Sequence, residues 1–147
     1  MNKQYALEIN HLSVSFFTAD GETEAVRDVS LSLRQGEVLA LVGESGCGKS
    51  VFCKAIMGLL PKDARIKSGE ILKGDTDIRK LSEREMQLLR GSGISMIFQD
   101  PLTSLNPTMT VGRQIAEAVK LHNRGLGRQQ IKAKVLELLD LVGITDA

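Results

Sequence analysis

The feature that most constrains this chain is a glycine-rich segment that directly follows a run of apolar residues. The segment Gly43-Glu-Ser-Gly-Cys-Gly-Lys-Ser50 has two glycines with four residues between them, then a lysine and a hydroxyl residue. Such glycines let successive backbone N–H groups turn inward and form a concave nest that complements a polyphosphate. The preceding residues 38–42 are apolar and β-rich, which predicts a buried strand of a parallel sheet. Strand, glycine loop and helix together predict a phosphate-binding loop.

The residues of this loop have different predicted roles. A helix that begins near Gly48 directs its partial positive N-terminus at the bound phosphates. Lys49 supplies a full positive charge for the β- and γ-phosphates, and the Ser50 hydroxyl can join the coordination shell of Mg²⁺. The candidate nucleotide-binding residues of the loop are Gly43, Glu44, Ser45, Gly46, Cys47, Gly48, Lys49, Ser50 and Val51. The alternative interpretation is a solvated or decayed loop.

Apolar periodicity predicts the elements around this loop. Residues 7–16 and 26–33 alternate, which predicts two antiparallel strands joined through a turn at Asp20-Gly21. A helix is expected from residue 48 to about 60, where Pro61 would close it. Residues 69–74 predict a short strand.

The second half of the chain predicts further elements. Ser82 and Glu85 form a capping box for a helix over residues 82–90, and residues 94–98 predict a second buried strand. Residues 100–109 contain two prolines and predict an irregular loop. A helix over 111–122, capped by Thr110, and a last amphipathic helix are expected after it.

Composition excludes several classes of function. The chain of 147 residues has 19 basic and 18 acidic side chains interspersed, with a net charge of +1, which argues against a nucleic-acid-binding surface. Apolar runs fall far short of the roughly 20 residues needed to cross a bilayer, and the N-terminus does not resemble a secretory signal. Cys47 and Cys53 have no nearby histidine and are expected to be reduced thiols. A cytosolic location is expected, with any membrane association made through a partner.

The residues Ser45 to Ser50, together with Phe98-Gln99 at the end of a predicted strand, resemble the ATP-binding cassette (ABC) family. This resemblance implies an α/β fold with a P-loop NTPase core and an antiparallel β-subdomain. The segment Leu102 to Met109 and the start of the loop at Gly43-Glu44-Ser45 resemble the oligopeptide/dipeptide permease branch, which also includes importers of nickel. Coupling of ATP binding and hydrolysis to uptake of peptides or related small solutes is the implied function.

The resemblance also implies roles for individual residues, with ATP and Mg²⁺ as cofactors. Phe16 matches the aromatic residue that stacks on adenine, with Phe17 as the less favoured substitute, although Phe16 could instead be a core residue at a strand end. Gln99 matches the residue that touches Mg²⁺ and the attacking water, and it would be catalytic with Lys49. Val51 stands where many members have threonine, so a hydroxyl contact to the α-phosphate would be absent.

The implied partners are those of a transport ATPase at the cytoplasmic face of the membrane. Integral membrane permease subunits would contact the region Gln99 to Met109, where Leu102, Leu105 and Met109 could form a groove or simply pack below the following helices. A second ATP-binding cassette, identical or paralogous, would complete the site. An extracytoplasmic solute-binding protein would act indirectly.

Two elements of the family pattern have no match in this sequence. Hydrolysis requires a second apolar strand that ends in aspartate and glutamate, but the nearest candidate, Asp140, lies in a segment of helical periodicity. The glycine-rich signature segment is also absent. We therefore expect an N-terminal portion, with residues 1–98 as the first half of the ATP-binding core and 99–147 as the glutamine loop and the start of an incomplete helical subdomain.

Such a chain is expected to bind nucleotide without hydrolysing it. One alternative is a naturally short, non-catalytic nucleotide-binding protein. Another is a small P-loop kinase, in which Arg124 and Arg128 would belong to a lid over the phosphates.

Overall fold

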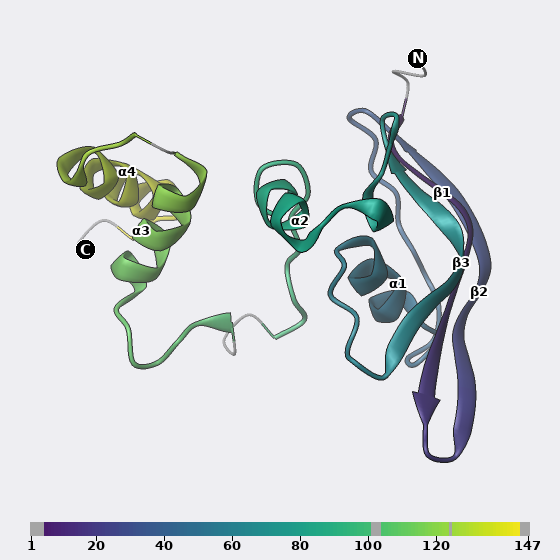
Figure 1. Ribbon diagram of the computed structural model, residues 1–147. Helices are drawn as coiled ribbons and strands as arrows, with labels where there is room; N and C mark the ends of the chain where they lie inside the picture. The colour runs from purple at the N-terminus through teal and green to yellow at the C-terminus, as the bar shows by residue number, and fades with distance from the viewer. Residues whose placement is uncertain (1–4, 101–103, 124, 145–147) are drawn as a thin grey trace. The chain divides into compact units, whose positions relative to one another are not determined.

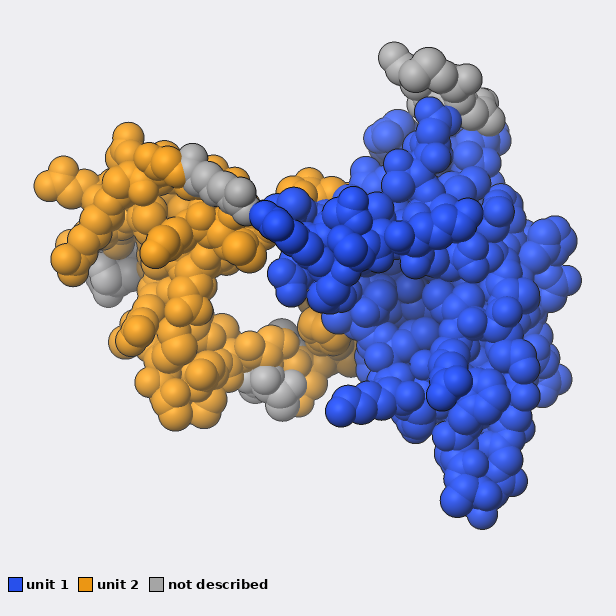
Figure 2. Space-filling model, in the orientation of Figure 1, with its two compact units in different colours: residues 1–90 blue, residues 91–147 orange. Residues whose placement is uncertain are grey.

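The computed structural model describes residues 5–100, 104–123 and 125–144. The chain divides into two compact units, residues 1–90 and 91–147, which Figure 2 colours separately. This division does not test the predicted boundary at residues 98 and 99, between the first half of the ATP-binding core and the glutamine loop, and that boundary stays a prediction. The elements in chain order are β1 (Tyr5–Thr18), β2 (Gly21–Arg34), α1 (Lys49–Ile56), β3 (Ala64–Lys73), β4 (Thr76–Asp77), the 3-10 helix η1 (Ile78–Lys80), α2 (Glu83–Leu89), α3 (Val111–His122) and α4 (Arg128–Leu141).

The first unit is built on an antiparallel sheet with the strand order β2-β1-β3-β4 (Figure 1). The predicted hairpin is confirmed: β1 and β2 pair from Tyr5 opposite Arg34 to Thr18 opposite Gly21. Because β1 lies between two partners, its apolar side chains are the most deeply buried, and Ile9, Leu12 and Val14 are fully buried together with Ile71 of β3. The strand predicted over residues 69–74 corresponds to β3, which begins earlier, at Ala64, and ends at Lys73.

The two predicted parallel-sheet strands are not formed, which corrects the expectation for residues 38–42 and 94–98. Neither segment pairs as a strand with the described part of the chain. Val38 and Val42 are 96% and 94% exposed, and Ile97 is 91% exposed. Apolar β-branched residues favour a strand, but a strand forms only where a neighbour completes its hydrogen bonds.

The helix after the phosphate-binding loop is shorter than predicted. It ends at Ile56, with Met57 as the C-terminal cap, because Gly58 adopts a left-handed conformation (φ 62°) that terminates the helix before Pro61 is reached. The predicted capping box of α2 is confirmed, since the Ser82 Oγ accepts from the Glu85 N–H and the Glu85 carboxylate accepts from the Ser82 N–H.

Arg90 connects the ends of these two helices. Its guanidinium donates to the Met57 carbonyl at 2.9 Å and the Gly58 carbonyl at 3.1 Å, and it pairs with Glu83 at 2.7 Å. The carbonyls at the C-terminus of α1, which lack partners inside the helix, are satisfied in this way. The contact fixes the far end of the helix whose N-terminus adjoins the glycine loop.

The second unit contains the helices α3 and α4, which pack on each other through Val119, Val135 and Leu139. Both predicted helices are confirmed. Thr110 lies at the N-cap of α3 as expected, but its side chain makes no capping hydrogen bond. The Gln114 side chain instead bonds the backbone of the preceding loop, accepting from the Asn106 N–H and donating to the Asn106 and Met109 carbonyls. Within the described residues, no helix is both long and apolar enough to cross a bilayer.

Candidate functional site

The glycine loop follows β2 after a turn and a segment without regular secondary structure, and its last glycine lies against the same strand. Gly46 and Gly48 have positive φ angles of 83° and 91°, which side-chain-bearing residues adopt at a cost. A Cβ atom on Gly48 would lie 2.3 Å from the carbonyl oxygen of Ala25 in β2, so glycine is also required there by close backbone contact. Both constraints bring the loop backbone close to the sheet at the point where α1 begins.

Lys49 directs its ammonium group into the loop that precedes it. The Nζ atom donates to the Gly43 carbonyl at 2.7 Å, the Glu44 carbonyl at 2.6 Å and the Cys47 Sγ at 3.2 Å. The loop therefore surrounds a fully charged donor with a curved backbone, which is the arrangement that a polyphosphate would contact. The sequence predicted the charge of Lys49 but contained no signal for these three partners.

Cys47, which bonds the Lys49 ammonium, is also a titratable side chain of the glycine loop. Its thiol is exposed, and the hydrogen bond from Lys49 is the main cause that lowers the pKa of Cys47 below its ordinary value, while desolvation opposes the shift. The second cysteine, Cys53, is half-buried on α1. No disulfide joins them, in agreement with the expectation of reduced thiols.

The helix α1 is held on the sheet by its buried face. Phe52 and Ala55 are buried, and the Val26 side chain lies against the start of the helix. No acidic residue stands in the first turn, so the positive end of the helix dipole is not neutralised. Ser50 is exposed, and among the described residues its hydroxyl has no hydrogen-bond partner. A free hydroxyl oxygen next to Lys49 fits the oxygen ligands that Mg²⁺ prefers.

Strand alternation separates the two candidate aromatic residues. Phe16 lies opposite Ala64 and shares a face of β1 with Val14, which lies opposite Val26. This is the face on which α1 packs (Figure 1). Phe16 thus lies on the same side of the sheet as the glycine loop.

Phe17 lies on the opposite face of the strand. There its ring is covered by two cations of β3, with Arg65 at 5.4 Å and Lys67 at 5.5 Å from the ring centre. The ring is therefore engaged by cation–π contacts away from the loop. Of the two phenylalanines, only Phe16 lies on the face of β1 against which α1 packs, and its role in stacking on adenine stays a prediction.

The remaining predicted residues belong to the second unit. Gln99 is exposed and lies in a bend, Leu105 is 46% exposed, and Met109 is half-buried. Leu102 and Arg124 lie outside the described residues. Arg128 begins α4. The contribution of Gln99 to the loop of the first unit stays a prediction.

Comparison with known proteins gives a consistent family assignment. The sequence model of the ABC transporter family matches residues 26–147. The dipeptide transport ATP-binding protein DppD of Lactococcus lactis is 48% identical over the whole chain, which spans 42% of that protein. The oligopeptide transport ATP-binding protein OppD of Bacillus subtilis is 52% identical over 94% of the chain, which spans 38% of that relative. The chain therefore spans less than half the length of these curated relatives.

The fold has its counterpart among solved structures. The ATP-binding cassette MJ0796, in a dimer bound to ADP and phosphate, superposes with a TM-score of 0.76 at 20% identity. The match covers 92% of this chain and 56% of that protein. The likeness identifies the fold as that of the cassette ATPases, and with the family match over residues 26–147, the chain belongs to the ABC transporter family.

Proposed function

We propose that this chain is the nucleotide-binding part of an ATPase subunit that powers uptake of peptides or related small solutes such as nickel. The observation that carries the proposal is the Lys49 ammonium, held inside a glycine loop at the N-terminus of α1. The names of the dipeptide and oligopeptide transport relatives support the substrate class. The alternative of a small P-loop kinase is disfavoured by the match of the ABC transporter family to residues 26–147.

The chemistry follows from the parts of the loop. The backbone N–H groups and the N-terminus of α1 bind the phosphates, and Lys49 leaves its carbonyl partners to pair with the β- and γ-phosphates. Ser50 would hold Mg²⁺, which supplies charge neutralisation at the phosphates when bound. Phe16 offers a ring on the same side of the sheet for stacking on adenine. Gln99 would bring a further ligand for Mg²⁺ and for water.

Hydrolysis and transport require groups beyond these. We propose that the described residues bind ATP without hydrolysing it, because the sequence has no second apolar strand that ends in aspartate and glutamate. A second cassette, as in the dimeric MJ0796 structure, would supply the opposing half of the composite site. Permease subunits would contact the region from Gln99 to Met109 at the cytoplasmic face of the membrane, and an extracytoplasmic solute-binding protein would deliver the solute to them.

Titration with a fluorescent ATP analogue in the presence of Mg²⁺ tests the proposal. Replacing Lys49 with methionine removes a charge-assisted contact, and we expect the dissociation constant to rise about 10- to 150-fold. Lys54→Met, at the other end of α1, is the matched control because it removes the same charge from the same helix. Equal affinity of the Lys49 variant and the parent would refute nucleotide binding at this loop. Lys49-dependent release of phosphate by the purified chain would refute the non-hydrolysing assignment.

A further inference from the structure

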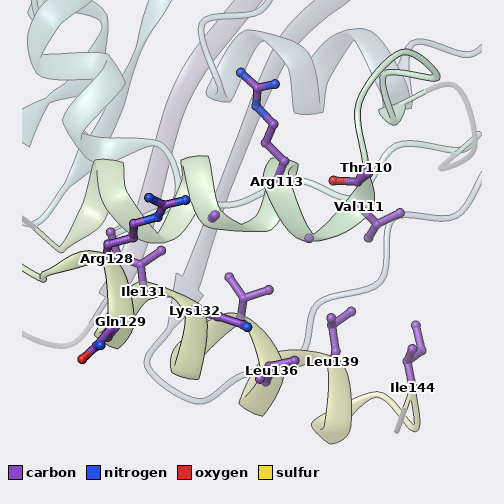
Figure 3. A pocket seen from close by; sticks show the side chains of 13 residues that line it. Thr110, Val111, Arg113, Arg128, Gln129, Ile131, Lys132, Leu136, Leu139 and Ile144 are labelled. Atoms are coloured by element: carbon purple, nitrogen blue, oxygen red, sulfur yellow. The ribbon is translucent and has the colours of Figure 1, made fainter. Parts of the chain in front are cut away.

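Two cavities lie apart from the glycine loop. The larger, of about 990 Å³, lies between α3 and α4 and is lined by residues of the second unit alone (Figure 3). The smaller, of about 210 Å³, lies in the first unit at the C-terminal end of α1, and residues of β3, η1 and α2 complete its lining. Of the two, the smaller cavity adjoins the helix that begins at the glycine loop, so its lining bears on the nucleotide site.

Two arginines line this smaller cavity, and they bond different parts of the first unit. Arg79 bonds the carboxylate of Asp77, whereas Arg90 bonds the carbonyl groups of Met57 and Gly58 at the end of α1. The two side chains are similarly accessible, with Arg79 25% exposed and Arg90 20% exposed. Because they differ in partners rather than in burial, Arg79 can serve as a control for Arg90.

The backbone at the end of α1 satisfies only part of its own carbonyl groups. The N–H groups of Met57, Gly58 and Leu59 bond three carbonyls inside the helix. The next two carbonyls, those of Met57 and Gly58, accept from Arg90 at 2.9 Å and 3.1 Å. The approach is close, since a Cβ atom on Gly58 would lie 3.1 Å from the guanidinium. Without Arg90, water in the cavity would have to replace these bonds, and they would no longer tie α1 to α2.

The helix α1 is short, and contacts hold it at both ends. Its eight residues extend over roughly 12 Å. Gly48 lies against Ala25 of β2 at one end, and Arg90 bonds the other. Lys49 and Ser50 belong to the first turn, so a tilt of the helix about its buried face displaces both side chains. A displacement of about 1 Å is enough to weaken the contacts of a precisely placed group.

We propose that Arg90 is a positioning residue for nucleotide binding, which holds α1 in the orientation that directs Lys49 to the phosphates. This inference rests on the proposed function, and it adds a residue that acts through α1 rather than by contact with the nucleotide. Three different nitrogens of the guanidinium take part: Nε bonds Met57, Nη2 bonds Gly58 and Nη1 pairs with Glu83 at 2.7 Å. The planar fork of arginine makes these three contacts at once, which the single nitrogen of lysine cannot do.

The affinity of the 147-residue chain for a fluorescent ATP analogue with Mg²⁺ tests this proposal. Arg90→Met removes the bonds to α1 but keeps an unbranched side chain, and we expect the dissociation constant to rise about three- to tenfold. Arg90→Lys is a milder variant that keeps the charge beside Glu83, and its dissociation constant should lie between those of Arg90→Met and the parent. Arg79→Met is the matched control, which should lower the stability towards urea but leave the dissociation constant within about twofold of the parent.

A second comparison separates positioning from a general loss of stability. If Arg90 acts through Lys49, Arg90→Met should change the dissociation constant by less than about twofold in a Lys49→Met background, because the group that it positions is already absent. A variant that merely unfolds a fraction of the chain reduces the affinity by the same factor in both backgrounds. Far-UV circular dichroism of each variant measures that fraction directly.

Three results would overturn the proposal while leaving nucleotide binding at the loop intact. The first is affinity of Arg90→Met and Arg90→Lys equal to that of the parent, although Lys49→Met weakens binding. The second is a loss of affinity in Arg79→Met as large as that in Arg90→Met. The third is an equal effect of Arg90→Met with and without Lys49. Affinity that does not depend on Lys49 at all would instead refute the proposed function, and this inference with it.

Discussion

Replacing Gly48 with alanine tests whether close contact between the glycine loop and β2 holds the phosphate-binding loop in place. The added methyl group meets two obstacles. The first is the φ angle of 91°, and the second is the Ala25 carbonyl oxygen, which would lie 2.3 Å from the new Cβ. Because that oxygen belongs to the backbone of a paired strand, it cannot rotate away as a flexible side chain would.

Gly46 separates the two contributions. It has a similar φ of 83°, but a Cβ there would have no atom within 4 Å. Gly46→Ala should therefore cost only the left-handed backbone penalty, about 1–2 kcal/mol. Gly48→Ala should cost a further 1–3 kcal/mol or so, because the strand or the loop must shift to relieve the contact. The second substitution would remove a large share of the roughly 5–15 kcal/mol that stabilises a typical domain.

Urea unfolding followed by far-UV circular dichroism measures these free energies of unfolding. The affinity for a fluorescent ATP analogue should fall more in Gly48→Ala than in Gly46→Ala, because only the former displaces the loop from β2. Equal losses of stability in the two variants, to within about 0.5 kcal/mol, would show that the contact with Ala25 contributes nothing and would refute the reasoning.

Two further predictions concern ionisable groups. The hydrogen bond from Lys49 lowers the pKa of Cys47, so in a Cys53→Ser background the thiol should react rapidly with a thiol-specific reagent at pH 7, and Lys49→Met should slow the reaction and move its pH profile upward. An unchanged profile would contradict the assigned cause. The Arg79 guanidinium donates two hydrogen bonds to the carboxylate of Asp77 and is the main cause that lowers its pKa from 3.8 to about 2. Because the folded-state pKa is the lower one, this stabilisation is present above about pH 4 and is lost as the pH falls towards 2. Asp77→Asn should lower the free energy of unfolding by about 1 kcal/mol at pH 7, after allowance for solvent screening, and the difference from the parent should narrow in urea titrations between pH 4 and pH 2. If the difference in free energy of unfolding between the variant and the parent stays constant from pH 4 to pH 2, the ion pair is not the source of this stabilisation.

Secondary-structure elements that depend on residues close together in the sequence could be predicted from the sequence. The hairpin of β1 and β2 follows from alternating apolar residues and a glycine turn, and α2 begins at the predicted capping box. The helix α3 has the predicted bounds because its apolar stripe extends over the whole segment. The end of α1 was predicted wrongly, since Gly58 stops the helix before Pro61.

The strands expected at residues 38–42 and 94–98 show that an apolar, β-branched sequence pattern is not sufficient to predict a strand. An apolar β-branched run indicates a preference for burial, but it does not contain the partner that satisfies its backbone. Val38 and Ile97 are therefore almost fully exposed despite their strand-like surroundings. Such pairing is decided between segments, so local composition cannot predict it.

The candidate site divides in the same way. The sequence by itself determined which groups the loop contains: the glycines at 46 and 48, the charge of Lys49 and the hydroxyl of Ser50. These are chemical properties of residues at fixed spacing, and they need no knowledge of distant segments. Only the tertiary structure decided how the groups meet. Contacts between residues far apart in the chain depend on the pairing of strands. The approach of Gly48 to Ala25 and the position of Phe16 and Phe17 on opposite faces of the sheet therefore emerge only once β1, β2 and β3 are in register.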